Sequence, residues 1–459
     1  MSGSWYCRGK RSHGPDAGLT SARDLALRAL ALMDDGMPVQ AAVDSVLGTS
    51  LAPPRERRLA SELVYGCARE RIRTEAILAR LLRKPEGLPR PLLHILAIAI
   101  HSLLFQGGIP AHAAISEAVK QVDRRYGVRL ARVANGALRS LQRLGEAPLE
   151  LAWYEDARDE PAIRQWRAAC CFWSLPESIA DLWRDAYGEE GALALMRRSF
   201  QRPWTGIRIN ARHPQAPALR DALAAAVPEA QRASLGVWGM AFAPGTLPEE
   251  VLGQTLAQLR ETGLLAFQSA GSQAVLAELG LDTWREPVWD ACAGVGGKSL
   301  ALLEAGVPVR LATDTSWARL SRLAAADAPL GSPHVLLALA DAAKPPVGRW
   351  SGHILVDAPC SGLGVLARRP DIRFPGRRGR EMLRAWPQTQ TRILAALAAR
   401  LRHGRELAYL TCTLNPQENE EVVAVLLKRE RGLELVRSWM TPMEHPWLEG
   451  MYGALLHRR

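Results

Sequence analysis

Two cysteines stand where the sequence could form a covalent bond to a substrate. Cys360 lies in the run DAPCSG, which begins at Asp357, and Cys412 lies in the run TCTLNPQENE, which begins at Thr411. Each run follows a short apolar stretch, residues 354–356 and 407–410, that predicts a buried strand. Because the carboxyl ends of parallel strands open onto one crevice, we expect both thiols in the same crevice. A thiolate there could act as a nucleophile.

A glycine-rich turn upstream could hold a cofactor. The run DACAGVGGK, from Asp290 to Lys298, follows a predicted strand at 288–289 and precedes a helix expected to begin near Ser299. Glycines allow close backbone approach to a ligand, and the helix N-terminus favours a carboxylate. The spacing is not that of a nucleotide-binding P-loop. The candidate cofactor contacts in this turn are Cys292, Ala293, Gly294, Val295, Gly296, Gly297 and Lys298.

Acidic residues follow three further predicted strands. Asp314 comes after the strand predicted at 309–312, Asp341 after 335–339, and Asp357 after 354–356. Asp314 could accept both hydroxyls of a ribose and Asp341 the amino group of an adenine, so an adenosyl ligand would suit this edge of the sheet. Each aspartate could instead simply cap the following helix, but that explanation weakens when all three occur in order.

Taken together, the three motifs resemble the RNA cytosine-C5 methyltransferase family, in its branch that acts on small-subunit ribosomal RNA. The resemblance implies S-adenosylmethionine as cofactor. It also implies that Cys412 is the nucleophile, that Cys360 assists proton removal or product release, and that Asp357 holds the edge of the target base. DNA cytosine methyltransferases attack with the Pro-Cys cysteine and lack a second cysteine comparable with Cys412, so its presence favours RNA. The alternative is that the thiols are inert and buried.

Charge points to a polyanionic partner. The net charge is +11 and the pI is about 9.7, which favours nucleic acid, although a soluble enzyme from an Arg-rich proteome would look similar. The loop with Arg368, Arg369 and Arg373 resembles the family's basic loop, with Phe374 in place of the more usual tryptophan. Phosphate contact is the functional interpretation, and a solvated charged loop is the alternative. The target base must be unpaired or flipped.

The N-terminal third predicts a helical bundle. Apolar residues recur at helical spacing from residue 20 to about 144. The segment resembles the NusB-type RNA-binding domain in the runs ELVYGCAR at 62–69, IPAHAAISEAV at 109–119 and NGALR at 135–139. This resemblance implies RNA contact by basic side chains, with Arg69 and Arg139 as candidates. They could instead form the solvated face of a structural bundle.

The expected architecture is multidomain. We expect a disordered tail at 1–18, a NusB-like all-α bundle at 19–144, a linker at 145–160, a small α+β subdomain at 161–280, and a doubly wound, Rossmann-like α/β methyltransferase domain at 281–459. In the last domain a helix is expected at 389–402, and two further strands at 433–436 and 452–456.

Composition excludes several classes of protein. The seven cysteines form no CxxC pair and no Cys/His cluster, so neither a disulfide framework nor a metal site is expected, and a reducing cytoplasm is the expected location. The N-terminus lacks the apolar stretch of a signal peptide, and the apolar run 91–105 is too short to span a bilayer. A monomer is expected.

The expected reaction is methyl transfer to C5 of a cytosine in 16S ribosomal RNA. The same chemistry on tRNA or 23S ribosomal RNA is an alternative, which the NusB-like segment makes less favoured. A non-catalytic RNA-binding assembly factor is another. The family's usual Ala-Pro is Gly294-Val295 here, and its usual aspartate is Ser269. Those departures support the assembly factor, whereas the intact aspartates and cysteines oppose it.

Overall fold

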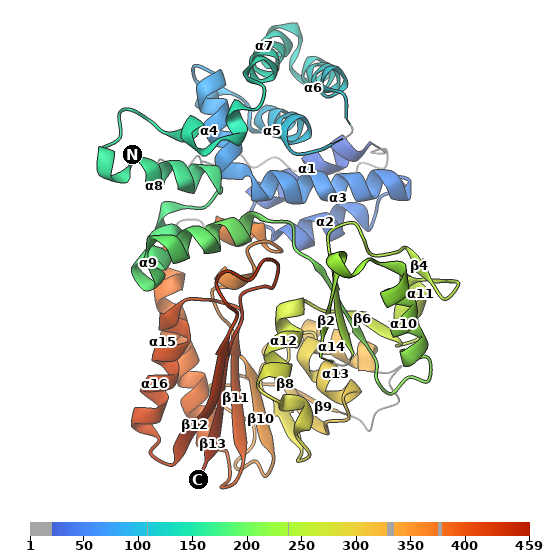
Figure 1. Ribbon diagram of the computed structural model, residues 1–459, viewed down its shortest axis with the longest axis vertical. Coiled ribbons are helices and arrows are strands. Elements are labelled where there is room, and N and C mark those ends of the chain that lie inside the picture. The colour runs from blue at the N-terminus through green and yellow to red at the C-terminus, as the bar shows by residue number, and fades with distance from the viewer. Residues whose placement is uncertain (1–20, 108, 237, 328–334, 375–378) are drawn as a thin grey trace. The chain divides into compact units, whose positions relative to one another are not determined.

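The computed structural model describes residues 21–107, 109–236, 238–327, 335–374 and 379–459 (Figure 1). The expected tail at 1–18 lies outside these residues. The chain forms two compact units. One consists of Met1–Arg184 with Arg369–Phe374, and the other of Asp185–Arg368 with Pro375–Arg459. The boundary falls within α9 (Glu177–Phe200), whose helical geometry is interrupted at Gly188.

Helices build the first unit, and its described residues contain no strand, which confirms the predicted all-α class. They are α1 (Ala22–Asp34), α2 (Val39–Leu47), α3 (Pro54–Arg69), α4 (Arg71–Leu81), α5 (Arg90–Leu104), α6 (Ala111–Tyr126), α7 (Val128–Leu144) and α8 (Pro161–Phe172).

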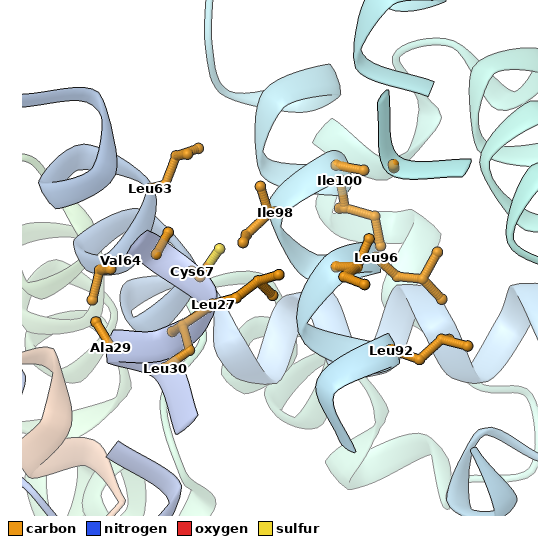
Figure 2. Packing of buried hydrophobic residues seen from close by; sticks show 14 of the residues in the cluster. Leu27, Ala29, Leu30, Leu63, Val64, Cys67, Leu92, Leu96, Ile98 and Ile100 are labelled. Atoms are coloured by element: carbon orange, nitrogen blue, oxygen red, sulfur yellow. The ribbon is translucent and has the colours of Figure 1, made fainter. Parts of the chain in front are cut away.

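Apolar side chains at helical spacing form the core of this unit. Leu27 and Leu30 of α1, Leu63 of α3 and Leu92 and Leu96 of α5 all belong to one buried cluster (Figure 2). Spacings of three and four residues place such side chains on one face of a helix, which is why the sequence pattern located these helices.

The segment 145–160 is packed against the helices rather than extended. It holds two 3-10 helices, Ala147–Leu149 and Leu151–Tyr154. Tyr154 is buried and its hydroxyl accepts a hydrogen bond of 3.0 Å from Arg73 Nε. Arg73 also donates to the carbonyl oxygen of Pro148, at 2.7 Å.

The second unit begins with a small antiparallel sheet of order β2-β3-β1-β6. Ile207 and Phe242 lie in its buried core. The elements of this region are β1 (Thr205–Ile209), α10 (Ala216–Ala226), β2 (Arg232–Leu235), β3 (Gly239–Phe242), β4 (Glu250–Val251), β5 (Gln254–Thr255), α11 (Leu256–Glu261), β6 (Leu265–Phe267) and α12 (Ala270–Glu278).

A seven-stranded sheet of order β12-β13-β11-β10-β7-β8-β9 follows. Strands β7 to β11 are parallel, whereas β13 is antiparallel to both β11 and β12. The elements are β7 (Val288–Asp290), α13 (Gly297–Glu304), β8 (Val309–Asp314), α14 (Trp317–Asp327), β9 (Leu336–Leu339), β10 (His353–Asp357), α15 (Gly379–Ala398), β11 (Glu406–Thr411), α16 (Glu420–Arg429), β12 (Leu433–Met440) and β13 (Tyr452–Arg458).

Both faces of this sheet are buried. In β10, Ile354 and Val356 pack in the cluster that contains residues of α15 and α16, whereas Leu355 packs in the cluster with residues of α13 and α14. Continuous apolar runs are typical of parallel strands covered on both faces. The predicted doubly wound sheet is confirmed. The strand order reverses between β7 and β10, so the carboxyl ends of these two strands are the switch point of the sheet.

Two element boundaries differ from the prediction. Helix α15 begins at Gly379, not near 389, and runs through Pro387; a proline normally marks a helix start, so the first turns were not recognised. Strand β12 continues to Met440, because β13 pairs with it along its length although Leu435 and Val436 are exposed. No helix among the described residues is long and apolar enough to cross a membrane.

Candidate active site

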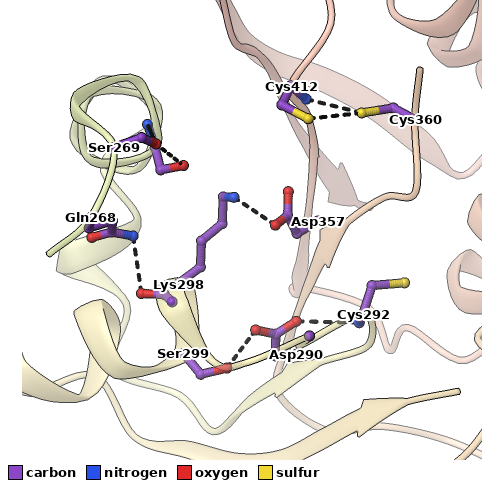
Figure 3. A network of polar contacts seen from close by, with 12 residues as sticks. Gln268, Ser269, Asp290, Cys292, Lys298, Ser299, Asp357, Cys360 and Cys412 are labelled. Atoms are coloured by element: carbon purple, nitrogen blue, oxygen red, sulfur yellow. Dashed lines mark hydrogen bonds and ion pairs between the residues drawn. The ribbon is translucent and has the colours of Figure 1, made fainter. Parts of the chain in front are cut away.

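The two predicted cysteines lie side by side in the structure. Strands β10 and β11 are parallel neighbours, with Asp357 opposite Leu410, so the loops that follow them begin at the same sheet edge. The sulfur atoms of Cys360 and Cys412 are 3.2 Å apart, and the backbone N–H of Cys412 donates to Cys360 Sγ at 3.3 Å (Figure 3).

The contact makes the two thiols chemically unequal. The pKa of Cys412 is lowered, chiefly because the Cys360 thiol donates a hydrogen bond to its sulfur and also because the Lys298 cation is near, although burial opposes this. The same hydrogen bond, with burial and the charge of Glu418, raises the pKa of Cys360. Cys412 is therefore the thiol that ionises first, and the thiolate is the nucleophilic form.

Asp357 and Lys298 form an ion pair beside the cysteines. Lys298 Nζ lies 2.7 Å from Asp357 Oδ2 (Figure 3), and the lysine side chain is 9 % exposed. Burial is the largest single influence and acts to lower the pKa of Lys298, but the charge and hydrogen bond of Asp357, together with Cys412 and Asp290, raise it overall. The sequence predicts Lys298 only as a cofactor contact in the glycine-rich turn. A cation in the first turn of a helix is unfavourable and could have signalled a partner.

The glycine-rich turn is held at both ends by Asp290. This buried carboxylate accepts hydrogen bonds from Ser299 Oγ at 2.6 Å and from Cys292 N at 3.3 Å. Burial is the main cause that raises the pKa of Asp290 to about 7. Gly296 has φ of +85°, and a side chain there would meet Leu323, so the turn needs glycine at this position.

Asp314 and Asp341 both follow strands at the same sheet edge, as predicted. Asp314 is buried and accepts from Gly294 N at 2.9 Å and Ser316 N at 2.8 Å. Asp341 is exposed and accepts from Ala343 N at 2.9 Å. Both therefore bind local backbone, the role of the simpler alternative, but Asp341 also has a carboxylate open to solvent.

Large apolar side chains are exposed close to these aspartates in the chain. Val295 in the glycine-rich turn is 43 % exposed, Trp317 at the start of α14 is 57 % exposed, and Leu339 at the end of β9 is 60 % exposed. They follow or end neighbouring strands β7, β8 and β9. Exposed apolar groups beside carboxylates are suited to a ligand with an aromatic ring and hydroxyl groups.

The loop around Cys412 is closed by buried polar groups. Thr411 Oγ1 donates to Asn419 Oδ1 at 2.6 Å, and Asn419 Nδ2 donates to the Thr413 carbonyl at 3.0 Å. Gly364 N donates to the carbonyl oxygen of Cys412 at 3.0 Å, and a side chain at Gly364 would collide with the backbone of Gly450. These contacts fix the backbone that carries Cys412.

Cys292 does not belong to the cysteine pair. It contributes its backbone N–H to Asp290, and burial raises the pKa of its thiol. Ser269, the residue that differs from the family pattern, caps α12 by accepting from Ser272 N. Because serine and aspartate are both good caps, the substitution retains this local role.

The predicted RNA-binding arginines lie in different environments. Arg373 is 1 % exposed and donates to the carbonyls of Trp173 and Ser174, at 3.1 and 2.7 Å, within the first unit. Arg69 is 7 % exposed. Their burial does not fit the expected phosphate contact, because a phosphate would need access to the guanidinium.

The other three arginines are more accessible. Arg139 is exposed on α7 and bonds to Gln142. Arg368 pairs with Glu449 and Arg369 with Asp371, and both arginines are half-buried. In the described part of the chain, no group of three or more His, Cys, Asp or Glu side chains is placed to hold a metal ion.

Comparison with known families agrees with this arrangement. Residues 281–448 match the family model described as 16S rRNA methyltransferase RsmB/F, and residues 20–143 match the NusB family model. The segment 281–448 is therefore similar to the RsmB/F ribosomal RNA methyltransferases, and a segment similar to the NusB family precedes it. In the RsmB/F segment fall the glycine-rich turn, both cysteines and all three predicted aspartates.

Curated relatives span most of the chain. A probable ribosomal RNA small subunit methyltransferase B of Bacillus subtilis (strain 168) is 29% identical over 423 residues, covering 90% of each chain. A ribosomal RNA small subunit methyltransferase B of Escherichia coli O6:K15:H31 is 28% identical over 417 residues, covering 87% of this chain and 88% of the relative.

Solved structures show the same fold. The protein PH0851 superposes with a TM-score of 0.71 at 18% identity, covering 98% of this chain and 100% of its own. NSun6 from Pyrococcus horikoshii, solved with SFG, has a TM-score of 0.51 at 19% identity, covering 62% of this chain and 98% of its own.

Proposed function

We propose that this protein transfers a methyl group from S-adenosylmethionine to C5 of a cytosine in 16S ribosomal RNA, through a covalent bond between Cys412 and C6 of the base. The observation that carries this proposal is the contact of the two sulfurs at 3.2 Å, with the pKa of Cys412 lowered and that of Cys360 raised. Lys298 next to the pair further favours a thiolate at Cys412.

The residues present fit the proposed cofactor. S-adenosylmethionine would supply an electrophilic methyl group. The glycine-rich turn and the N-terminus of α13 would hold its amino-acid end, and Asp314 and Asp341 would accept from its hydroxyl and amino groups. The exposed faces of Val295 and Trp317 offer apolar contact to a flat ring.

Cytosine C5 must be made nucleophilic before it can accept a methyl group. The Cys412 thiolate would add to C6, forming an S–C6 bond and moving the electrons of the C5–C6 double bond toward C5. Asp357, held by Lys298, would accept a hydrogen bond from the N4 amino group on the N3–N4 edge of the base and so orient the ring. After C5 gains its methyl group, loss of the C5 proton re-forms the double bond and breaks the S–C6 bond. Cys360 would assist this release.

Ribosomal RNA of the small subunit is the favoured substrate. Relatives that cover most of the chain are named small subunit methyltransferases, and a NusB-family segment precedes the catalytic one. The net charge of +11 suits a polyanion, and the exposed Arg139 is the best placed of the predicted RNA contacts in the first unit. This substrate implies action in the cytoplasm.

A denaturing gel tests the chemistry. Cys360→Ala protein is mixed with 16S RNA and S-adenosylmethionine, beside Cys412→Ala and the wild type. If Cys412 is the nucleophile and Cys360 assists release, Cys360→Ala retains a covalent RNA adduct and Cys412→Ala forms none. Cys171→Ala is the matched control, because that free thiol lies in α8 of the first unit, and it should turn over like the wild type.

Three other results would contradict the proposed nucleophile, the proposed substrate or the proposed activity. An adduct in Cys412→Ala but not in Cys360→Ala would assign the attack to the Pro-Cys cysteine, as in DNA enzymes. Parallel reactions on tRNA and 23S RNA test the substrate, and preferential methylation of either would overturn the 16S assignment. If the wild type methylates no RNA and does not bind S-adenosylmethionine, a non-catalytic assembly factor becomes the better description.

A further inference from the structure

Glu418 is a buried carboxylate that the reaction scheme does not use. It lies in the 3-10 helix Pro416–Glu418, after Cys412 in the chain, and is 0 % exposed. Its two oxygens accept four hydrogen bonds: from Ser361 N at 2.8 Å, Ser361 Oγ at 2.6 Å, Gln390 Nε2 at 3.1 Å and Asn415 Nδ2 at 3.2 Å.

These partners belong to both cysteine loops. Ser361 follows Cys360 directly, and Gln390 Nε2 also donates to the carbonyl of Pro359, the residue before Cys360, at 3.0 Å. The hydroxyls of Ser361 and Thr413 are 2.9 Å apart, and Thr413 follows Cys412. The residues on both sides of Cys360 are therefore bound to Glu418 or to its partner Gln390, and the Cys412 loop joins the same network.

The charge of Glu418 is costly where it lies. Burying a carboxylate is unfavourable unless it is paired or fully hydrogen-bonded. All four donors are neutral, and within the described part of the chain no cation pairs with Glu418. A neutral glutamine could not replace it, since its NH₂ group would face other donors. Only an ionised carboxylate accepts all four bonds at once.

We propose that Glu418 is a positioning residue that holds the Cys360 loop against the Cys412 loop, so that the two sulfurs stay in contact. The inference rests on the proposed function for its kinetic consequence, but the geometry can be tested without RNA or cofactor. The same carboxylate favours the protonated form of Cys360, because its negative charge is one of the causes that raise the pKa of that thiol. A protonated Cys360 is the form that can donate to Cys412.

The first test measures how readily the two thiols meet. Diamide accepts the two hydrogens of a thiol pair and leaves a disulfide, and the initial rate of forming the Cys360–Cys412 bond is followed by peptide mass mapping. We expect Glu418→Gln to slow this bond about tenfold, the size of effect usual for groups in one hydrogen-bond network. Glu421→Gln, an exposed neighbour in α16, should match the wild type.

The second test is kinetic. If Glu418 positions the cysteines, Glu418→Gln lowers kcat on 16S RNA by about 10²-fold, the usual result of moving a reacting group by about 1 Å. The KM for S-adenosylmethionine should stay within about twofold, because Glu418 does not touch the glycine-rich turn. Absence of methyl transfer in the wild type would refute the proposed function and leave the diamide result standing.

A third test measures the effect of the Glu418 charge on the ionisation of Cys360. In a Cys412→Ala background, alkylation of Cys360 by iodoacetamide should reach half its maximal rate at lower pH when Glu418→Gln is added. A residue that only fills space would leave this midpoint unchanged.

A milder variant guards against failure to fold. Ser361→Ala removes one hydroxyl and leaves the other donors to Glu418, so it should fold and slow diamide coupling by a smaller factor. Where Glu418→Gln folds, the double variant Ser361→Ala/Glu418→Gln should slow diamide coupling little more than Glu418→Gln alone, because both changes act on one network. If diamide coupling and kcat both stay at wild-type values in folded Glu418→Gln, or in Ser361→Ala where Glu418→Gln does not fold, the proposal is overturned.

Discussion

The two halves of the candidate active site are built in opposite ways. At the ends of β10 and β11, the groups around the cysteines satisfy one another, and Thr413, Glu418 and Asn419 are completely buried. At the ends of β8 and β9, Asp341 and Trp317 are exposed. One half is a closed hydrogen-bond network, whereas the other presents exposed apolar and acidic side chains.

This difference corresponds to what each half would do. Bond formation needs reacting groups held within a fraction of an ångström, which a closed hydrogen-bond network provides. Binding a cofactor that must enter and leave needs surface that is free between turnovers. Substitutions in the cysteine half should therefore alter rate, and those in the cofactor half should alter affinity.

The largest effect is expected at the nucleophile. Cys412→Ala should reduce methyl transfer to 16S RNA by about 10³-fold or more, because it removes the proposed nucleophile that bonds to C6. Binding of S-adenosylmethionine, measured by calorimetry, should be unchanged. Loss of cofactor binding in this variant would mean that the two halves are not separable.

Asp290 is a buried acid in the cofactor half, so the pH dependence of stability tests that half of the site. Its pKa of about 7 lies above its ordinary 3.8, so its protonated form favours folding. This contribution is fully present below about pH 4 and is lost as pH rises toward 7. Relative to Asp290→Asn, the free energy of unfolding of the wild type should fall over that range by a few kcal/mol at most, as urea titrations at each pH would show. A constant difference would contradict the raised pKa.

A substitution at Trp317 tests the cofactor half. Trp317→Ala should raise the Kd for S-adenosylmethionine about tenfold through loss of aromatic contact, with kcat at saturating cofactor retained. Leu435→Ala is a matched control, since Leu435 is 44 % exposed on the edge strand β12 and should leave the Kd unchanged. A fall in kcat with no change in Kd would place Trp317 with the reacting groups instead.

The smallest expected effect is a shift in pH dependence. Cys412 has a lowered pKa chiefly because Cys360 donates to it. In Cys360→Ala, the midpoint of Cys412 alkylation by iodoacetamide should therefore move to higher pH. Cys292→Ala should not move it. An unchanged midpoint in Cys360→Ala would mean that Lys298 alone favours the thiolate.

Short apolar runs were enough to predict the sheet. Ile354 to Val356 and Leu407 to Leu410 could hardly be anything but buried strands, and parallel pairing then brought Cys360 and Cys412 to one edge. Loss of periodicity at β12, where Leu435 and Val436 are exposed, hid the end of that strand, because pairing with β13 rather than burial maintains it.

Side-chain partners were less predictable than elements. The Lys298–Asp357 pair and the bonds from Ser361 and Gln390 to Glu418 join residues far apart in sequence, so no local pattern marks them. For Arg373, a local sequence pattern exists but predicts the wrong environment. A run rich in arginine predicts a solvated or phosphate-binding loop, yet tertiary packing buried this guanidinium against two carbonyls.

The position of Arg373 affects how the chain can fold as it is synthesised. The helical unit takes in Arg369–Phe374, although its other residues end at Arg184. The carbonyls of Trp173 and Ser174 can therefore bind the Arg373 guanidinium only late in synthesis. Arg373 leaves the ribosome after most of the second unit has been made. A nascent chain that stops before Arg373 would have the helices but not this buried arginine. Cutting the gene at residue 184 would leave the same gap, so the first unit is complete only in the uncut chain.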